Sequence, residues 1–395
     1  MDTNLFFKHQ AQTTPFPKAL KIKKAYGSFI EDYSGKKYID LVSGVSANTL
    51  GHNHPKIIEA IKNQISNYMH VMVYGEYIQS PQYNLALLLS KQLTKDLNCT
   101  YFVNSGCEAI EGAMKLAKRV TGKNEFISCN DSYHGSTHGT LSIMGNEYYK
   151  QKYRPLLPEC NKINYNDFND INKISSKTAG VIIEPIQGAT GFVKSNKKWL
   201  KKIRERCNET GSILIFDEIQ SCFGRTGKLF AFQEYNVTPD VLCIAKGMGG
   251  GMPIGAFISS HKKMNLLKIN PELGHITTFG GHPVNCAASL ATLKILINEK
   301  NIIKTIKDKE IMIRKMLNHP SILEIRGCGL MLGVELGCSE KCKKFVDEAY
   351  NEGLITFFFL FNKSSVRLSP PLTISFDEIE FACKKFIKVL NKIKT

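Results

Sequence analysis

Residues 239–256, PDVLCIAKGMGGGMPIGA, decide the fold. The apolar run Val241–Ala245 has the length and composition of a buried strand. Lys246 ends this run, and Gly247 and then Gly249–Gly251 follow it. Glycines let a backbone approach a ligand closely, and open α/β sheets bind ligands beyond the carboxyl ends of their strands. The stretch indicates an α/β fold with a nucleophilic amine at a strand end, although a solvated lysine in a turn fits the same letters.

Similar apolar runs alternate with helical patterns on either side of this stretch, from about residue 85 to 290. They predict strands at Thr100–Val103, Glu125–Ser128, Gly180–Ile183, Ile213–Phe216, Val241–Ala245 and Ala256–Ser259. Helical patterns at Cys107–Val120 and Lys197–Thr210 follow two of these runs. Such alternation predicts a large domain with a mostly parallel sheet covered by helices.

The pattern changes after residue 290. Long helical stretches and the glycine-punctuated segment RGCGLMLGVEL predict a smaller α+β domain. We expect an N-terminal segment, 1–45, that joins this small domain, a large cofactor-binding domain, 46–290, and the small domain itself, 291–395. The apolar run Leu354–Phe361 reads as one buried strand, far too short to span a bilayer. The opening MDTNLFFKHQ does not resemble a secretory signal.

The net charge of +17 raises the question of nucleic-acid binding. However, lysines are spread along the chain, and the densest basic stretch, 196–206, carries Trp199, Leu200 and Ile203 at helical spacing. Its lysines therefore form the wet face of an amphipathic helix. The 12 cysteines are scattered without zinc-type spacing. We expect a cytoplasmic protein with reduced thiols and with no metal, nucleic-acid or membrane partner.

Two further strand ends carry reactive or anion-binding groups. Asp217 follows Ile213–Phe216, where a carboxylate can keep a pyridine nitrogen protonated, although a helix cap or a metal ligand fits as well. Ser105 and Gly106 join a strand to a helix, a turn that suits a phosphate or a plain N-cap. The glycine patterns of P-loops and dinucleotide-binding folds are absent.

These features occur in one order along the chain and bring further motifs with them. The chain resembles class III aminotransferases of fold type I, which depend on pyridoxal phosphate, and is similar to acetylornithine and ornithine aminotransferases. The resemblance extends from GSFIEDYSGKKYIDLVSGVSANTLGHNHP to VRLSPPLTIS, nearly the whole chain. Between these ends it rests on NSGCEA, SYHGSTHGT, IIEPIQG, FDEIQSCFGRTG, PDVLCIAKGMGGGMPIGA and TTFGGHP.

The resemblance implies a role for each matching residue. Lys246 would hold the cofactor as a Schiff base and move the proton, and Asp217 would pair with the ring nitrogen. The remaining cofactor residues would be those that hold the phosphate (Ser105, Gly106, Cys107), those beside the ring (Tyr133, His134, Gln220) and Thr278, which would reach the phosphate of the partner in a homodimer. Arg367 would clamp the substrate carboxylate, and Glu184 would support the floor of the site.

Two positions depart from the ornithine-type pattern. Ala189 stands where those enzymes carry a Glu that masks the carboxylate-binding Arg, and Ser136 stands where they carry an Arg for a second carboxylate. Transamination of acetylornithine or succinyldiaminopimelate, in arginine or lysine biosynthesis, is the first expectation by overall resemblance. Alanine–glyoxylate, aspartate, ornithine or 4-aminobutyrate transamination stays open. A 2,1-aminomutase and a non-catalytic basic binding protein are the alternatives of other kinds.

Overall fold

The computed structural model describes residues 1–393 and contains a seven-stranded sheet in the order β4-β12-β11-β10-β7-β5-β6. Its pairs are parallel except that β12 is antiparallel to both of its neighbours, β4 and β11. This confirms the predicted, mostly parallel α/β sheet. The strands are β4 (Cys99–Val103), β5 (Glu125–Cys129), β6 (Cys160–Ile163), β7 (Thr178–Ile183), β10 (Ile213–Asp217), β11 (Val241–Ile244) and β12 (Gly255–Ser259).

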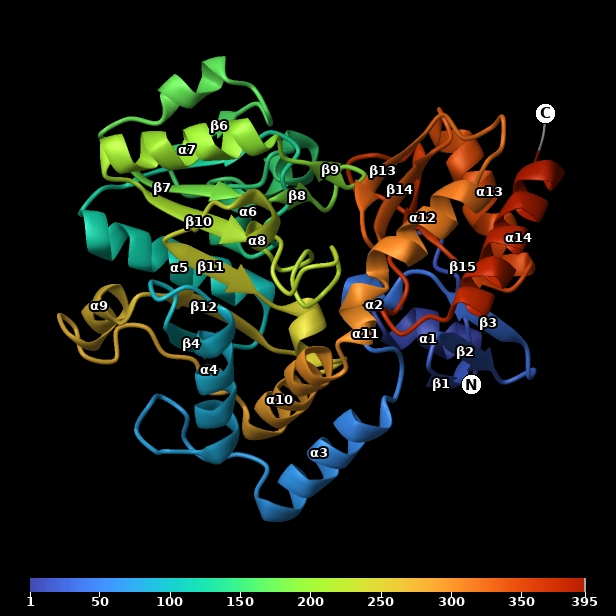
Figure 1. Cartoon of the computed structure of the whole chain (residues 1–395), viewed down its shortest axis with the longest axis horizontal. Helices are drawn as coiled ribbons and strands as arrows, with labels where there is room; N and C mark the ends of the chain where they lie inside the picture. The colour runs from blue at the N-terminus through green and yellow to red at the C-terminus, as the bar shows by residue number, and fades with distance from the viewer. Residues whose placement is uncertain (394–395) are drawn as a thin grey trace.

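Helices cover this sheet (Figure 1). The 16-residue helix α5, Gly106–Thr121, packs on β12 and β11, and Gly112 in its middle makes the close contact possible. A Cβ atom at Gly112 would lie 2.3 Å from the Phe257 ring. Other helices of this part are α3 (Pro55–Asn67), α4 (Ser80–Gln92), α6 (His138–Ser142), α7 (Lys197–Thr210), α8 (Phe232–Tyr235), α9 (His261–Met264) and α10 (Pro283–Asn298).

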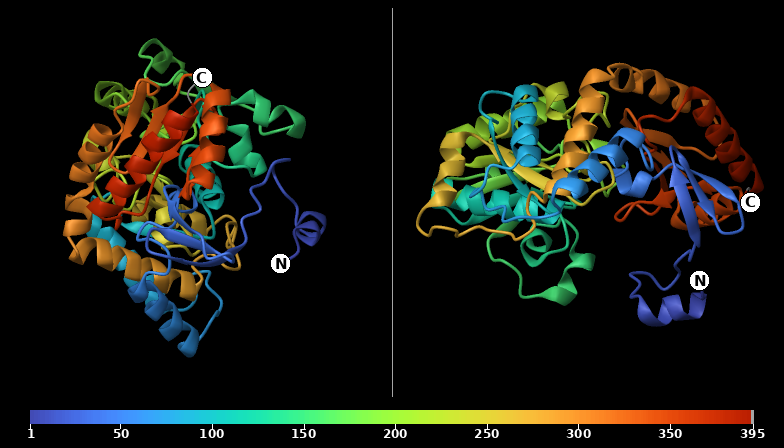
Figure 2. Two further views of the ribbon diagram at one scale, coloured as in Figure 1. Left: turned by 90° about the vertical axis from the view of Figure 1, so that its right-hand side faces the viewer. Right: turned by 90° about the horizontal axis from the view of Figure 1, so that it is seen from below.

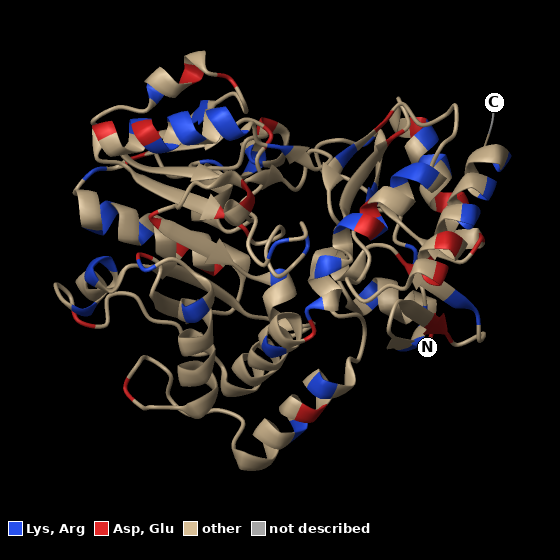
Figure 3. Cartoon of the chain, viewed as in Figure 1, with Lys and Arg blue, Asp and Glu red and all other residues tan. Residues whose placement is uncertain are grey.

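Helix α7 is amphipathic, as the sequence predicts. Trp199, Leu200, Ile203 and Cys207 are buried. Figure 3 shows that Lys and Arg lie on many helices in both parts of the chain rather than on one element. The net positive charge of the chain is therefore distributed over the solvated surfaces of many helices rather than gathered on one element.

The second part of the molecule is built from both ends of the chain (Figures 1 and 2). Residue Ile39 of β3 pairs in parallel with Leu354 of β15, so the N-terminal strands and the C-terminal segment share a sheet. One sheet consists of β1 (Ile22–Tyr26), β2 (Phe29–Asp32), β3 (Lys37–Asp40) and β15 (Leu354–Ile355), and the other of β13 (Glu324–Cys328), β14 (Met331–Glu335), β17 (Ser365–Leu368) and β16 (Phe357–Phe358).

Helices α12 (Ile306–Met316), α13 (Ser339–Asn351) and α14 (Phe376–Lys392) cover these sheets. Shorter elements are α1 (Thr3–His9), α2 (Ser43–Ser46), α11 (Asn301–Lys304), β8 (Ile186–Gln187) and β9 (Val193–Lys194). In the part of the chain that the structure describes, no helix has the length and apolar character needed to cross a membrane.

The interpretation of Leu354–Phe361 as one strand is wrong. The run divides at Thr356 into β15, which pairs with β3, and β16, which pairs with β17 of the other sheet. The run is apolar because its residues belong to two different sheets and because Leu360, which follows β16, lines a cavity.

Candidate active site

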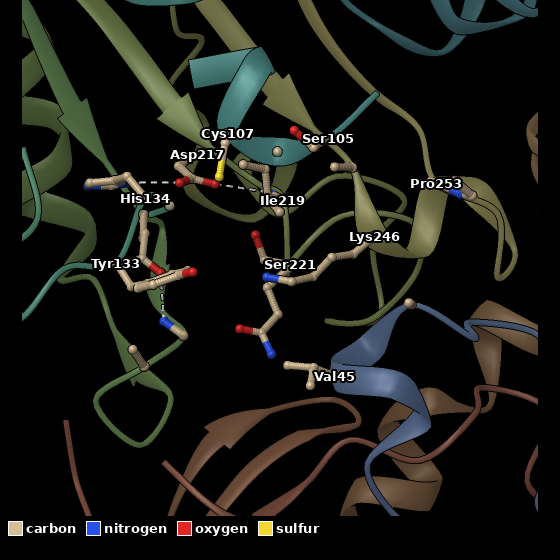
Figure 4. A pocket seen from close by; sticks show the side chains of 18 of the residues that line it. Val45, Ser105, Cys107, Tyr133, His134, Asp217, Ile219, Ser221, Lys246 and Pro253 are labelled. Carbon is tan, nitrogen blue, oxygen red and sulfur yellow. Dashed lines mark hydrogen bonds and ion pairs between the residues drawn. The ribbon is translucent and has the colours of Figure 1, made fainter. Parts of the chain in front are cut away.

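A cavity of about 600 Å³ lies where the large sheet meets the second part of the molecule (Figure 4). The parallel strands β10 and β11 end at the same edge of the sheet, since Asp217 lies opposite Cys243 in their register. Asp217 and Lys246 therefore both line the cavity. Ser105 reaches it from the turn before α5, and Arg367 reaches it from β17.

Lys246 begins a tight turn, Lys246–Gly249, and its side chain extends into the cavity (Figure 4). Its φ of 44° is a left-handed conformation, which is strained for a residue with a side chain and often marks a functional site. A Cβ atom at Gly247 would lie 2.2 Å from Thr49 Oγ1, so the turn needs glycine there.

The protein environment favours the neutral amine of Lys246. Removal from water lowers the pKa of Lys246, the carboxylate of Asp217 opposes this shift, and the cation of Arg367 adds to it. Within residues 1–393, no carboxylate lies within ion-pair distance of the amine. A neutral amine is the nucleophile that Schiff-base formation requires.

Asp217 is held in place by a buried hydrogen-bond pair. Its Oδ2 lies 2.7 Å from His134 Nδ1, and its Oδ1 accepts the backbone N–H of Ile219 at 3.0 Å. Asp217 and His134 are 6 % and 2 % exposed. The carboxylate therefore has one orientation at the cavity wall, and the imidazole lies beside it (Figure 4).

Glu184 is a third buried group in the wall. Its Oε1 accepts the backbone N–H of Tyr133 at 3.1 Å, and its Oε2 accepts the backbone N–H of Gly188 at 2.7 Å. Burial raises the pKa of Glu184 to about 7. The side chain thus joins the two segments that carry Tyr133 and Gly188 into the cavity, which agrees with a supporting position.

The sequence of the turn before α5 suited either a plain N-cap or a phosphate site, and the structure shows the N-cap at the wall of the cavity. Ser105 Oγ accepts the backbone N–H of Glu108 at 3.2 Å, so Ser105 is the N-cap. Ser105, Gly106 and Cys107 also line the cavity. A Cβ atom at Gly106 would lie 2.8 Å from Ile219 Cδ1. The first amides of a long helix attract an anion, so this end of the cavity suits a phosphate group.

Arg367 closes the other side of the cavity and is 7 % exposed. Its Cζ lies 4.6 Å from the ring centroid of Phe359 and 5.3 Å from that of Phe192. Nη2 donates a long hydrogen bond, 3.4 Å, to the carbonyl of Gly188, whereas Nε and Nη1 have no partner. Burial lowers the pKa of Arg367 to about 10. A buried guanidinium with free N–H groups is suited to a bidentate carboxylate.

Of the other residues singled out in the sequence, some line the cavity and two do not. Tyr133 and Gln220 line the cavity, as does Ala189. Ser136 is exposed outside the cavity, with its hydroxyl 3.2 Å from the hydroxyl of Tyr133. Thr278 is exposed and does not line the cavity of its own chain. Its predicted contact with a partner's cofactor thus depends on a second subunit.

Sequence reasoning missed the short turn α2. Its residues 43–46 all have positive φ, and Val45, with a φ of 58°, lines the cavity. A β-branched residue rarely adopts this conformation, which costs about 1–3 kcal/mol. Gly44 was the one sequence signal for the turn.

The residues around the cavity fit pyridoxal phosphate. The cavity offers a helix N-terminus for a phosphate, an oriented carboxylate in Asp217 for a ring nitrogen, and an amine of lowered pKa in Lys246 for an aldehyde. When bound, this cofactor supplies that aldehyde and a ring that accepts electrons from the carbon next to the substrate amine.

Proteins of similar sequence and structure are aminotransferases. The family model described as "Aminotransferase class-III" matches residues 10–390. Acetylornithine aminotransferase of Clostridium acetobutylicum is 38% identical over 371 residues, which cover 91% of this chain and 93% of that protein. The [LysW]-aminoadipate semialdehyde/glutamate semialdehyde transaminase of Sulfolobus acidocaldarius is 32% identical over 384 residues, which cover 95% and 96%.

A solved structure of the ornithine aminotransferase from Toxoplasma gondii, with partial occupancy of PLP at its active site, matches with a TM-score of 0.91. The two are 27% identical, and the match covers 99% of this chain and 93% of that one. The predicted fold, cofactor and resemblance are confirmed. The chain belongs to the class-III aminotransferase family and is a transaminase that depends on pyridoxal phosphate.

Proposed function

We propose that Lys246 is the residue that binds pyridoxal phosphate covalently and carries the proton during transfer of an amino group from an amino donor to a 2-oxo acid. The observation that supports this most strongly is the position of Lys246. It is an amine of lowered pKa at the end of β11, in the same cavity as the carboxylate of Asp217.

The other residues of the cavity then have distinct tasks. Asp217, oriented by His134, keeps the proton on the ring nitrogen, and the helix start at Ser105, Gly106 and Cys107 binds the phosphate. Tyr133 covers the ring face, and Gln220 lies near the phenolic oxygen. The Lys246 amine would also act as the base that removes a proton from the substrate carbon and delivers it to the carbon that comes from the cofactor aldehyde. Arg367 orients the substrate through its carboxylate.

The identity of the donor is a separate proposal. The relatives reported above are named for acetylornithine or for semialdehyde transaminases of amino-acid biosynthesis. Acetylornithine is accordingly the first donor to test, with succinyldiaminopimelate second. Ala189 lines the cavity at the position where the ornithine-type pattern has a glutamate.

A homodimer in the cytoplasm is the proposed working form. Thr278 is exposed between Ile276 and Phe279, whose exposed fractions are 47% and 55%. Ile78 is 94% exposed and Met69 is 62% exposed. Met69 and Phe279 lie on one face, because the ring centroids of His70 and Phe279 are 5.0 Å apart. A contiguous exposed apolar patch is typical of a surface that meets another chain. A second subunit on this face would bring Thr278 to its neighbour's phosphate.

The test is release of a 2-oxo acid. The protein loaded with pyridoxal phosphate is incubated with single amino acids, and the 2-oxo acid is measured by mass spectrometry. We expect one equivalent per active site without an acceptor and turnover with one, because the cofactor retains the nitrogen between two half-reactions. Absence of 2-oxo acid with every donor would contradict transamination, and an isomer that keeps its amino group would indicate a 2,1-aminomutase.

A further inference from the structure

Arg225 is a fully buried cation outside the cavity. It is 1 % exposed, and burial lowers the pKa of its guanidinium to about 9. It does not line the cavity, and within residues 1–393 no carboxylate lies within ion-pair distance of it. A buried charge without a paired carboxylate costs stability, so the hydrogen bonds of this side chain indicate what it holds in place.

One nitrogen of Arg225 bridges two neighbouring strands. Nη1 donates to the carbonyl of Leu330 at 3.2 Å and also to the carbonyl of Pro370. The main chain holds the same place, because the N–H of Leu330 donates to the Arg225 carbonyl at 3.0 Å. Leu330 immediately precedes β14, and Pro370 closely follows β17. Arg225 therefore fastens one end of this strand pair to the chain that follows β10.

The sequence explains why a side chain is needed at this place. Strands β14 and β17 are antiparallel, with Leu332 opposite Leu368. The same register, continued outward, brings Leu330 opposite Pro370. Proline has no backbone N–H, so the ladder of hydrogen bonds cannot continue through this pair. The guanidinium of Arg225 supplies a donor that both carbonyls share.

The contact joins the two sides of the cavity. Asp217 ends β10, and the chain continues from there to Arg225. Arg367 lies on β17, just before Pro370. Asp217 and Arg367 line one cavity but belong to different sheets. The distance between them therefore depends on how the second sheet is fastened to the chain that follows β10.

Other hydrogen bonds hold the end of β17 from other parts of the chain. The N–H groups of Ser369 and Leu372 donate to the carbonyls of Leu41 and Thr49 at 2.7 and 2.8 Å. These bonds tie the end of β17 to the chain on either side of the turn α2. The bond from Arg225, in contrast, ties it to the chain that follows β10.

We propose that Arg225 is a positioning residue for the substrate carboxylate. It holds the end of β14 and β17 against the chain that follows β10, and in this way it sets where Arg367 lies relative to Asp217 and Lys246. The proposal rests on the proposed function, in which Arg367 orients the substrate through its carboxylate.

The first test replaces Arg225 in the protein loaded with pyridoxal phosphate. Arg225→Met removes the donor and keeps an unbranched side chain, whereas Arg225→Lys keeps a cation that can donate to carbonyls. Propionate binding is measured by titration calorimetry, and the cofactor is followed by its visible absorbance band. We expect Arg225→Met to keep the band and to bind propionate at least about 10-fold more weakly than the parent, because charge-assisted hydrogen bonds to a carboxylate depend on their geometry. Arg225→Lys should recover part of this loss.

Arg314→Met is the matched control. Arg314 also donates to two backbone carbonyls, those of Ile325 and Gly327, but both lie on β13, next to its own helix α12. We expect this variant to melt at a lower temperature than the parent and to bind propionate within about 2-fold of it, because the contact does not reach the chain that follows β10.

A second pair of variants disturbs the same contact from the side of β14. A Cβ atom at Gly329 would lie 2.5 Å from the Arg225 carbonyl oxygen, so Gly329→Ala displaces the turn before β14 from Arg225. Gly337 also has a positive φ, but it follows the opposite end of β14. Both alanine variants strain the backbone. We expect Gly329→Ala to weaken propionate binding at least about 10-fold and Gly337→Ala to leave it within about 2-fold of the parent.

The outcomes separate this proposal from the proposed function. Propionate affinity like that of the parent in Arg225→Met or in Gly329→Ala overturns the proposal, while the visible band leaves the assignment of Lys246 intact; if one of these variants does not fold, the other decides. Equal weakening in either control also overturns it, because any damage to the second sheet would then have the same effect. A parent that binds propionate no more tightly than Arg367→Met removes the basis of the proposal, and a colourless parent contradicts the proposed function itself.

Discussion

We predict that Arg367, which is proposed to bind the substrate carboxylate, lowers the free energy of unfolding because its charged guanidinium is buried. Its pKa falls from 12.5 to about 10 on burial. Each unit corresponds to about 1.4 kcal/mol, so holding the charged guanidinium in the fold costs about 3 kcal/mol at neutral pH. The two rings of Phe359 and Phe192 offset about 1–2 kcal/mol of this through cation–π contacts. A net cost of about 1–2 kcal/mol remains.

The sign of this effect follows from linkage. The folded protein binds the guanidinium proton less tightly than the unfolded chain does, and both are protonated at pH 7. Arg367→Met keeps an unbranched side chain and removes the charge. We expect the variant to melt about 1–4 °C higher than the parent at equal protein and cofactor concentrations, measured by calorimetry. Loss of two charge-assisted hydrogen bonds should lower kcat/KM about 100-fold or more.

A matched control separates this account from a general effect of arginine removal. Arg326 has ion pairs at 2.9 Å with both Glu324 and Glu335. Arg326→Met leaves these carboxylates without their partner and should lower the melting temperature. The reasoning would be refuted if Arg367→Met destabilised the protein as much as Arg326→Met does, because Arg367 would then be a structural residue.

Three further predictions concern backbone contacts and pH. Gly106→Ala should weaken pyridoxal phosphate binding at least about 10-fold in equilibrium dialysis, since its Cβ would lie 2.8 Å from Ile219 Cδ1, and Ile219→Val should partly restore it. Gly112→Ala should destabilise the protein by about 1–3 kcal/mol in urea unfolding, because its Cβ would meet the Phe257 ring, and an unchanged midpoint would show that α5 moves freely. The pKa of Glu184 is raised to about 7, so the stability that this group contributes is complete below pH 4.5 and is lost as the pH rises through 7. The stability of the parent relative to Glu184→Gln should therefore fall from pH 5 to pH 8. A difference in melting temperature between the two proteins that stays constant over this range would contradict the shift.

The sequence predicted the elements whose signals are local. Helix α7 has the predicted bounds because Asn196 caps its start and Gly211 ends it in a left-handed conformation. The ends of two strands were also predicted from local signals, because Asp217 and Lys246 are charged residues that follow short apolar runs. Both residues lie at the same edge of the sheet because β10 and β11 are parallel.

Features set by tertiary contact were not visible. The edge strand β6 reads CNKI, too polar and too short to stand out, and it forms by pairing with β5. Val45 acquires its positive φ from the surrounding fold rather than from its own preference. The pair of His134 and Asp217 joins positions 83 residues apart, so only the folded chain shows that the imidazole holds the carboxylate.

The most direct test of the central claim is to locate the cofactor on the chain. The protein loaded with pyridoxal phosphate is reduced with borohydride, digested and sequenced by mass spectrometry. We predict a phosphopyridoxyl group on Lys246 alone, lost together with the visible absorbance band in Lys246→Ala. A label on another lysine, or a colourless protein that takes up no pyridoxal phosphate, would contradict the assignment of Lys246 and the function built on it.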